Sequence, residues 1–265
     1  RPTCGLQRGI DDLTLRNADT MKPNIRIYEN SQQLIRAAAE EVLRVAQESI
    51  AARQRFTLVL AGGSTPKALY ALLTDDPRLR DQMPWKSTLF FWGDERSVPP
   101  DHADSNYRMA NESMLAKAPV LKENIHRIKA EQPDAAEQYA RILTDNFSLR
   151  PGDFPQFDLV LLGMGTDGHT LSLFPHTAAL DETKKLIVSN SVPKLSTVRV
   201  TLTAPTVNHA HHAVFLVAGT DKAPALKSVL EGPTNPREYP SQLIAPADGN
   251  LTWMVDRLAG AELNR

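Results

Sequence analysis

Short apolar runs alternate with helical segments along most of the chain, and this alternation constrains the fold more than any other feature. Phe56–Ala61 and Phe157–Leu162 are continuous apolar runs, a pattern typical of strands covered on both faces. Between such runs lie amphipathic segments such as residues 31–54, where Leu34 and Val42 share one helical face. Strands separated by helices indicate right-handed βαβ units. The sequence therefore predicts an α/β fold with a mostly parallel sheet flanked by helices.

The remaining predicted elements continue this alternation without a linker or an internal repeat. Gly232 and Pro233 should end the last helix, because glycine caps helices and proline cannot continue them. We therefore expect residues 21–265 to form a single α/β domain. Further strands are predicted at Ile25–Tyr28, Thr88–Trp92, Lys185–Ser189, Thr197–Thr201, Ala213–Ala218 and Leu251–Val255, and further helices at Pro66–Leu73, Asn106–Leu115, Ala135–Phe147 and Asp221–Leu230.

Residues 1–20 differ from the rest of the chain because they show little apolar periodicity. They lack the continuous apolar core and the small-residue cleavage site of a signal peptide. We expect this segment to be a disordered extension that precedes the α/β domain.

Charge and cysteine content narrow the range of partners and compartments. Thirty Lys plus Arg residues oppose 31 Asp plus Glu residues, which leaves a formal net charge of −1. This balance gives no electrostatic reason to expect nucleic acid or a membrane surface as partner. No apolar run is long enough for a membrane span. Cys4, the only cysteine, excludes an intramolecular disulfide, so we predict a cytoplasmic protein. The sequence gives no sign of an obligatory protein partner, and we predict none.

A glycine pair follows the first buried strand in the segment Gly62-Gly63-Ser64-Thr65-Pro66. Thr65 suits the N-cap of a helix, and Pro66 suits its first position. Backbone N–H groups at Gly63 and Ser64 would then favour an anion such as a phosphate. A tight strand-to-helix turn without a ligand explains the segment equally well, and the spacing of a nucleotide P-loop is absent.

Charged residues follow two other predicted strands. Gly93–Arg96 reads Gly-Asp-Glu-Arg after a strand, where a solvated loop is the usual outcome. The functional alternative is that Arg96 holds a phosphate in bidentate fashion. Lys222 lies in the first turn of a predicted helix, where the helix dipole disfavours a cation unless an anion binds nearby. A solvated lysine is nearly as good an explanation.

The glycine-rich segment Phe157–Pro175 contains the spacing G-x-G-x-x-G after a strand. A dinucleotide site is rejected, because Pro175 interrupts the required helix and the strand at Lys185–Ser189 does not end in an acidic ribose ligand. The better interpretation is a loop that places Asp167 and His169 at the carboxyl end of a strand. An isolated histidine is more often structural, but this setting favours catalysis.

His209, His211 and His212 form the densest histidine group, yet their spacing need not converge on one ion. A polar connection before a strand is the simpler interpretation. We therefore predict no metal and no cofactor.

Five segments occur along the chain in the order LAGGSTPKALY, WGDERSVPPDHADSNYRMA, LLGMGTDGHTLSLFP, VAGTDKAPAL and LIAPADGNLTWMVD. Taken together, they resemble the 6-phosphogluconolactonase family of the pentose phosphate pathway. The resemblance implies a Rossmann-like sheet of the glucosamine-6-phosphate-deaminase type. It also implies His169 as catalytic base and a phosphate site near Arg96 and Lys222. Leu171 and Arg108 stand where the family commonly has small residues.

Lactone hydrolysis needs a positioned substrate and an activated water, and no redox cofactor. We assign the 6-phosphate of the substrate to Arg96, Lys222 and the Gly63–Ser64 backbone. His169 would activate the water, with Asp167 orienting either the histidine or the substrate. Glu95 and Asp167 are the next candidates for the base, and backbone N–H groups within residues 163–168 are candidate oxyanion donors.

Two other functions remain open at this point. Glucosamine-6-phosphate deaminase is similar at Asp94-Glu95 and Asp167-Gly168-His169, but it has F-N-E-P where this chain has Ser172–Pro175. The glutamate that supports ring opening would then be missing. A sugar-phosphate-sensing regulator domain is the second alternative, although residues 1–24 are too short for a helix-turn-helix.

Overall fold

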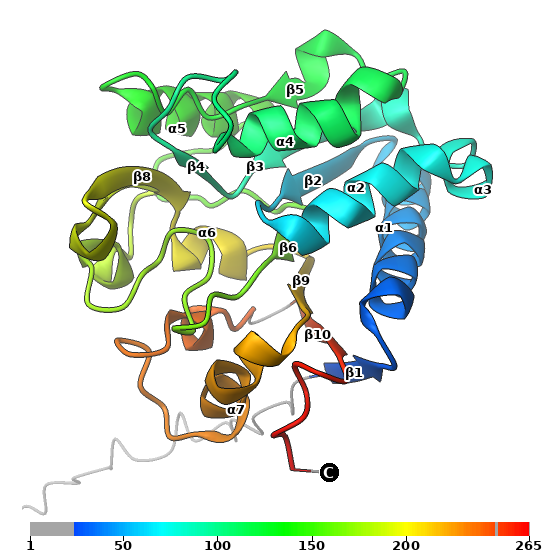
Figure 1. Cartoon of the computed structure of the whole chain (residues 1–265). Helices are drawn as coiled ribbons and strands as arrows, with labels where there is room; N and C mark the ends of the chain where they lie inside the picture. The colour runs from blue at the N-terminus through cyan, green and yellow to red at the C-terminus, as the bar shows by residue number, and fades with distance from the viewer. Residues whose placement is uncertain (1–23, 247–248, 265) are drawn as a thin grey trace, which may run out of the picture.

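The predicted parallel sheet is confirmed by the structure, a computed structural model that describes residues 24–246 and 249–264. Seven strands lie in the order β1-β10-β9-β6-β2-β3-β5, and every neighbouring pair is parallel (Figure 1). The predicted extension at residues 1–20 lies outside the described residues. The strands are β1 (Asn24–Tyr28), β2 (Phe56–Leu60), β3 (Thr88–Trp92), β5 (Ile125–His126), β6 (Leu159–Leu162), β9 (His212–Val217) and β10 (Asn250–Asp256).

Helices cover the sheet as the alternation predicts. The longest begins where the side chain of Asn30 accepts a hydrogen bond from the N–H of Gln33, and it ends at Gln54 in the left-handed conformation. No helix in the described ranges is long and apolar enough to cross a membrane. The helices are α1 (Ser31–Arg53), α2 (Ser64–Asp75), α3 (Pro77–Arg80), α4 (Asn106–Ser113), α5 (Ala135–Phe147), α6 (Ala204–Asn208) and α7 (Ala223–Glu231).

The two continuous apolar runs form the centre of the core. All residues of β2 and β6 are buried, and the two strands are neighbours in the sheet. α1 packs its apolar face, including Leu34 and Val42, against this sheet. Burying a large aliphatic or aromatic side chain contributes about 1.5–3 kcal/mol, so these buried strands contribute strongly to the stability of the fold.

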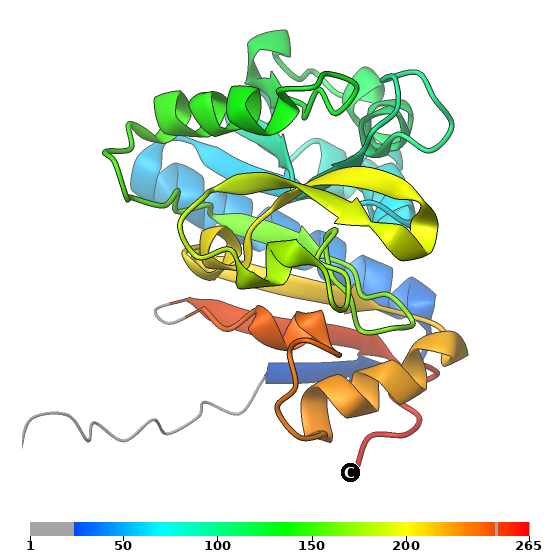
Figure 2. The same ribbon diagram turned by 90° about the vertical axis from the view of Figure 1, so that its left-hand side faces the viewer.

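A second, three-stranded sheet stands apart from the parallel one. β4 (Asp94–Arg96), β8 (Thr197–Leu202) and β7 (Ile187–Val192) pair in an antiparallel manner in the order β4-β8-β7. Figure 2 shows the hairpin of β7 and β8 in front of the parallel strands, with α1 behind them. The solvated loop considered for residues 93–96 is therefore wrong, because β8 supplies a partner edge for the Asp94–Arg96 backbone.

The topology creates a crevice between β2 and β6. From β2 the chain proceeds outward to β3, and from β6 it proceeds to β9 on the other side. Loops that leave neighbouring parallel strands in opposite directions leave an opening at the carboxyl ends of those strands, and ligands bind in such openings. The sequence segments selected above follow four strands that are adjacent in the sheet, β9, β6, β2 and β3.

Candidate active site

The carboxyl ends of these four strands enclose a hollow of about 250 Å³. It brings together four of the predicted site residues, Gly63, Arg96, His169 and Lys222. Ser64, the first residue of α2, is exposed and does not line it. We call this space the first hollow.

An adjoining space of about 300 Å³, the second hollow, lies toward the β7–β8 hairpin. The two hollows share Asp94, Arg96, His169 and Leu171, so they form one continuous cleft. The second hollow is lined in addition by Asp167, which the sequence predicted, and by Lys194 and Arg199, which it did not. A larger hollow of about 740 Å³ between α5 and β7 contains none of the predicted site residues.

Buried side chains fix the strand ends that carry the cleft. The hydroxyl of Tyr70 bonds to both the N–H and the carbonyl of Ala61, at 2.8 and 2.9 Å. The Tyr139 hydroxyl accepts from the N–H of Trp92 at 2.8 Å. The carboxylate of Asp256 accepts from the N–H of Gly219 at 3.1 Å. Each contact lies within a cleft segment or next to one, and it holds the backbone of that segment in place.

His169 and Asp167 form a close pair. Nδ1 of His169 lies 2.5 Å from Oδ1 of Asp167, and the imidazole stacks on the ring of Phe174 with centroids 4.1 Å apart. The hydrogen bond from His169, with a weaker contribution from Lys194, holds the pKa of Asp167 well below its ordinary value. An ionised Asp167 accepts the Nδ1 proton, which leaves Nε2 of His169 free to accept another.

The close approach of His169 to the backbone explains one glycine of the loop. A Cβ atom on Gly165 would lie 2.1 Å from Nδ1 of His169, so no larger residue fits without moving the imidazole. The N–H of Gly165 donates to the carbonyl of His169 at 2.8 Å, and the N–H of Gly168 donates to the carbonyl of Gly165 at 3.1 Å. Both N–H groups thus donate hydrogen bonds within the loop, so neither is available as an oxyanion donor.

Arg96 and Arg199 lie directly opposite each other across β4 and β8. Nε of each arginine is buried without a hydrogen-bond partner among the described residues, while Nη1 of Arg96 donates to the carbonyl of Asp104 at 2.5 Å. Burial, together with repulsion from Arg96, lowers the pKa of Arg199 below its ordinary value. Two adjacent guanidinium groups with unused donors form a strong site for a multiply charged anion.

The helix start after β2 differs from the sequence expectation. α2 begins at Ser64 with Gly63 as its N-cap, so Thr65 is not the cap and Pro66 is not the first helical residue. The φ angle of Gly63 is 104°, which only glycine adopts without strain, and this conformation turns the chain into the helix two residues earlier than predicted. Gly63 still lines the cleft, as predicted.

Comparison with known proteins identifies the family. Residues 29–253 match the model of the family described as glucosamine-6-phosphate isomerases/6-phosphogluconolactonase. The 6-phosphogluconolactonase of Nostoc sp. (strain PCC 7120 / SAG 25.82 / UTEX 2576) is 40% identical over 247 residues, covering 92% of this chain and 100% of that protein. The chain belongs to this family.

Two solved structures support the same placement. The 6-phosphogluconolactonase from Trypanosoma cruzi is similar with a TM-score of 0.80 and 27% identity, covering 92% of this chain and 98% of that one. A monomeric glucosamine-6-phosphate deaminase reaches a TM-score of 0.74 at 18% identity, covering 90% of this chain and 99% of that one, a likeness of fold alone. The Rossmann-like fold of the deaminase type is therefore confirmed.

Leu171, where the sequence resemblance leads us to expect a small residue, has an unusual backbone conformation. Its φ angle is +53°, a conformation that costs a branched L-residue roughly 1–2 kcal/mol. The side chain lies over Gly93, where an added Cβ would come within 2.5 Å of it, and it lines both hollows. The absence of a side chain at Gly93 makes room for an apolar wall in the cleft of this family member.

Glu95 is unsuited to the role of an alternative base. Its carboxylate accepts hydrogen bonds from the N–H groups of Arg96, Asn106 and Tyr107, each at 2.8 Å, and from the hydroxyl of Ser105 at 3.1 Å. Burial raises the pKa of Glu95, and the backbone donors oppose this effect. The residue anchors the start of α4 to β4 and has no free oxygen lone pair directed at the cleft.

The histidine group near β9 forms part of the connection that leads into this strand. Nδ1 of His209 lies 2.7 Å from the carbonyl of Pro205, and its ring stacks on Phe154. His212 opens β9. Nowhere in the described ranges do three His, Cys, Asp or Glu side chains gather closely enough to hold a metal ion. These contacts agree with a polar connection before the strand.

Proposed function

We propose that this family member hydrolyses 6-phospho-D-glucono-1,5-lactone to 6-phosphogluconate. The observation that carries the proposal is the cleft itself, where two partly unsatisfied guanidinium groups stand beside a histidine whose Nε2 is free. The first feature suits a phosphate, and the second suits a water that attacks a carbonyl. The named 6-phosphogluconolactonases that cover more than nine-tenths of the chain support the same substrate.

The phosphate of the substrate would bind Arg96 and Arg199, with Lys222 contributing from the end of β9. The ammonium of Lys222 lies 3.1 Å from the carboxylate of Asp221 and lines the first hollow. Gly63 offers backbone contact on the opposite side of the same hollow, and Ser64 has at most a backbone role. A phosphate held here positions the lactone ring, so that binding energy far from the carbonyl is used to orient the reacting atoms.

His169 would act as the catalytic base. Its side chain is 26% exposed, which admits a water to Nε2 while Asp167 fixes the ring through Nδ1. The water gives a proton to Nε2 as its oxygen bonds to the lactone carbonyl. The bond from this carbon to the ring oxygen then breaks, and His169 returns the proton to that oxygen. Asp167 thus orients the histidine, one of the two roles that the sequence left open.

Phe174 argues against deamination. It occupies the position at which the deaminase motif carries its glutamate, and its ring stacks on His169 with centroids 4.1 Å apart. An aromatic ring cannot exchange a proton with the imidazole, so the ring-opening step of the isomerising enzymes lacks its acid. A cytoplasmic location, independence from metals and the absence of an obligatory protein partner remain predictions.

A direct assay tests the proposed function. The purified protein is mixed with freshly generated 6-phosphogluconolactone, with unphosphorylated gluconolactone and with glucosamine 6-phosphate, and the spontaneous hydrolysis rate is subtracted. We expect rapid hydrolysis of the first lactone, much slower hydrolysis of the second and no release of ammonia from the third. Ammonia release would favour the deaminase, and binding of sugar phosphates without turnover would favour a sensing domain.

A further inference from the structure

Lys194 lies at the tip of the β7–β8 hairpin and reaches the catalytic pair from outside. Its Nζ is 3.1 Å from Oδ2 of Asp167, while Oδ1 of the same carboxylate is 2.5 Å from His169. One oxygen of the Asp167 carboxylate thus contacts the ammonium of Lys194, and the other contacts the imidazole of His169. Lys194 comes from the turn Pro193–Leu195, far in sequence from the glycine-rich loop.

We propose that Lys194 is a positioning residue, which shares Asp167 with His169 and thereby keeps the imidazole in its neutral, proton-accepting form. This inference rests on the proposed role of His169 as base. An isolated aspartate favours the protonated imidazole, because the opposite charges attract. The ammonium of Lys194 offsets part of that negative charge, yet it leaves Oδ1 in place to orient the ring.

Other charged groups around the cleft do not replace Lys194 in this position. Among the described residues, Lys194 is the lysine or arginine that pairs with the Asp167 carboxylate. Arg96 and Arg199 form no ion pair with it, and each keeps a buried Nε without a hydrogen-bond partner. The ionisable groups that line the two hollows with His169 are Asp94, Arg96, Asp167, Lys194, Arg199 and Lys222. Substrate phosphate would offset the positive charge of the two arginines. During turnover the charge of Lys194 would then be the one that offsets the negative charge of Asp167.

The test is an NMR titration of His169 in the free protein, compared between wild type and Lys194→Met. The His169 signal is assigned by its loss in His169→Gln. We expect the midpoint of the titration to move to higher pH in Lys194→Met, by only about 0.3–0.7 units because solvent screens the Lys194 side chain, which is 71% exposed. The acid limb of kcat/KM should move by the same amount, a loss of about 2–5-fold one unit below the midpoint.

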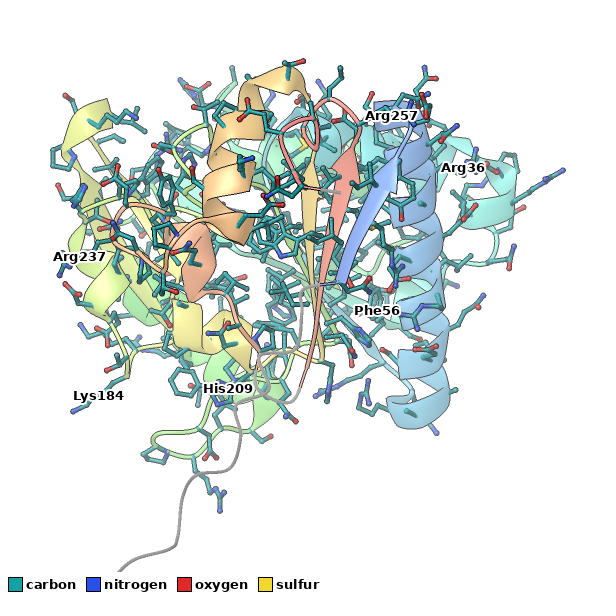
Figure 3. The ribbon with its side chains drawn as sticks, turned by 90° about the horizontal axis from the view of Figure 1, so that it is seen from below. Arg36, Phe56, Lys184, His209, Arg237 and Arg257 are labelled. Atoms are coloured by element: carbon teal, nitrogen blue, oxygen red, sulfur yellow. The ribbon has the colours of Figure 1, made fainter. Side chains whose placement is uncertain are left out.

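Two variants sharpen the result. Lys194→Arg keeps the charge and should restore the wild-type midpoint. Lys184→Met removes a lysine outside the cleft, which Figure 3 shows directed away from the body of the protein, and it should change neither midpoint nor rate. An unchanged His169 midpoint in Lys194→Met would overturn the proposal, as would a pH-independent rise in KM alone.

The titration also separates this inference from the proposed function. It needs no substrate, so a shifted midpoint in a protein that lacks lactonase activity would uphold the Lys194–Asp167–His169 coupling and refute the function. Lactonase activity combined with an unshifted midpoint would refute the coupling alone.

Discussion

The glycine loop after β6 and the β7–β8 hairpin contribute to the same cleft, but they are built differently. The loop follows a completely buried strand, and its neighbouring strand ends are fixed by the buried Tyr70, Tyr139 and Asp256. The hairpin has exposed residues at its tip, including Leu195 and Val198. It is tied back through Asn190, whose amide donates to the carbonyl of Ser172 at 2.9 Å. The hydrogen-bonded pair of Asp167 and His169 thus lies on the fixed edge, while the cations Lys194 and Arg199 come from the hairpin.

The largest expected effect comes from the fixed edge. His169→Gln should lower turnover about 10²–10⁴-fold, the usual contribution of a positioned general base, while phosphate-dependent product binding survives. Steady-state kinetics with the spontaneous rate subtracted will measure this. His176→Gln, an exposed histidine paired with Glu238, is the matched control and should retain full activity. Near-normal turnover in a folded His169→Gln would show that the base is another group.

A substitution in the β7–β8 hairpin should act on binding of the substrate phosphate. Arg199→Met should reduce kcat/KM for the phosphorylated lactone about 10–150-fold, because a charge-assisted contact contributes roughly 1.5–3 kcal/mol. Preference over unphosphorylated gluconolactone should shrink by a similar factor. Arg237→Met removes an exposed arginine paired with Asp181, outside the cleft, and should change neither value. Full selectivity in Arg199→Met would exclude this arginine from the phosphate site and leave the assignment to Arg96 and Lys222.

A third substitution tests whether the hydrogen bonds that fix the strand ends contribute to the stability of the fold. Tyr139→Phe leaves the N–H of Trp92 buried without its acceptor, so the free energy of unfolding should fall by about 1–3 kcal/mol. Urea unfolding will measure the change. Under conditions where the variant is folded, kcat should stay within a factor of about two. A large loss of kcat with unchanged stability would mean that Tyr139 acts on the chemistry and not on the fold.

The smallest expected effect is that of a chelator. Because no step of the proposed reaction uses a metal ion, dialysis against a chelator should leave the rate unchanged. The assay of the dialysed protein, with and without added divalent ions, provides the measurement. Activity that is lost and then restored by one ion would place a metal in the cleft and revise the role of both regions.

Much of the fold could be predicted from the sequence because its signals are local. Continuous apolar runs such as Phe56–Ala61 identify buried parallel strands, and glycines after them mark strand ends. The residues of the glycine-rich loop, Asp167 and His169, could be selected for the same reason. The boundaries were less accurate, as Gly63 shows, because the start of α2 depends on a backbone angle that Thr65 and Pro66 do not reveal.

The sequence by itself predicted the parallel sheet and the edge at which the cleft lies, and it selected the pair Asp167 and His169, because each follows from residues near one another in the chain. Only the tertiary structure decided that β8 pairs with Asp94–Arg96 and sets Arg199 opposite Arg96. It likewise decided that Lys194 meets Asp167 across 27 positions of sequence. Antiparallel pairing and long-range ion pairs depend on where the hairpin packs, and no local pattern around Arg199 or Lys194 distinguishes them from solvated surface residues.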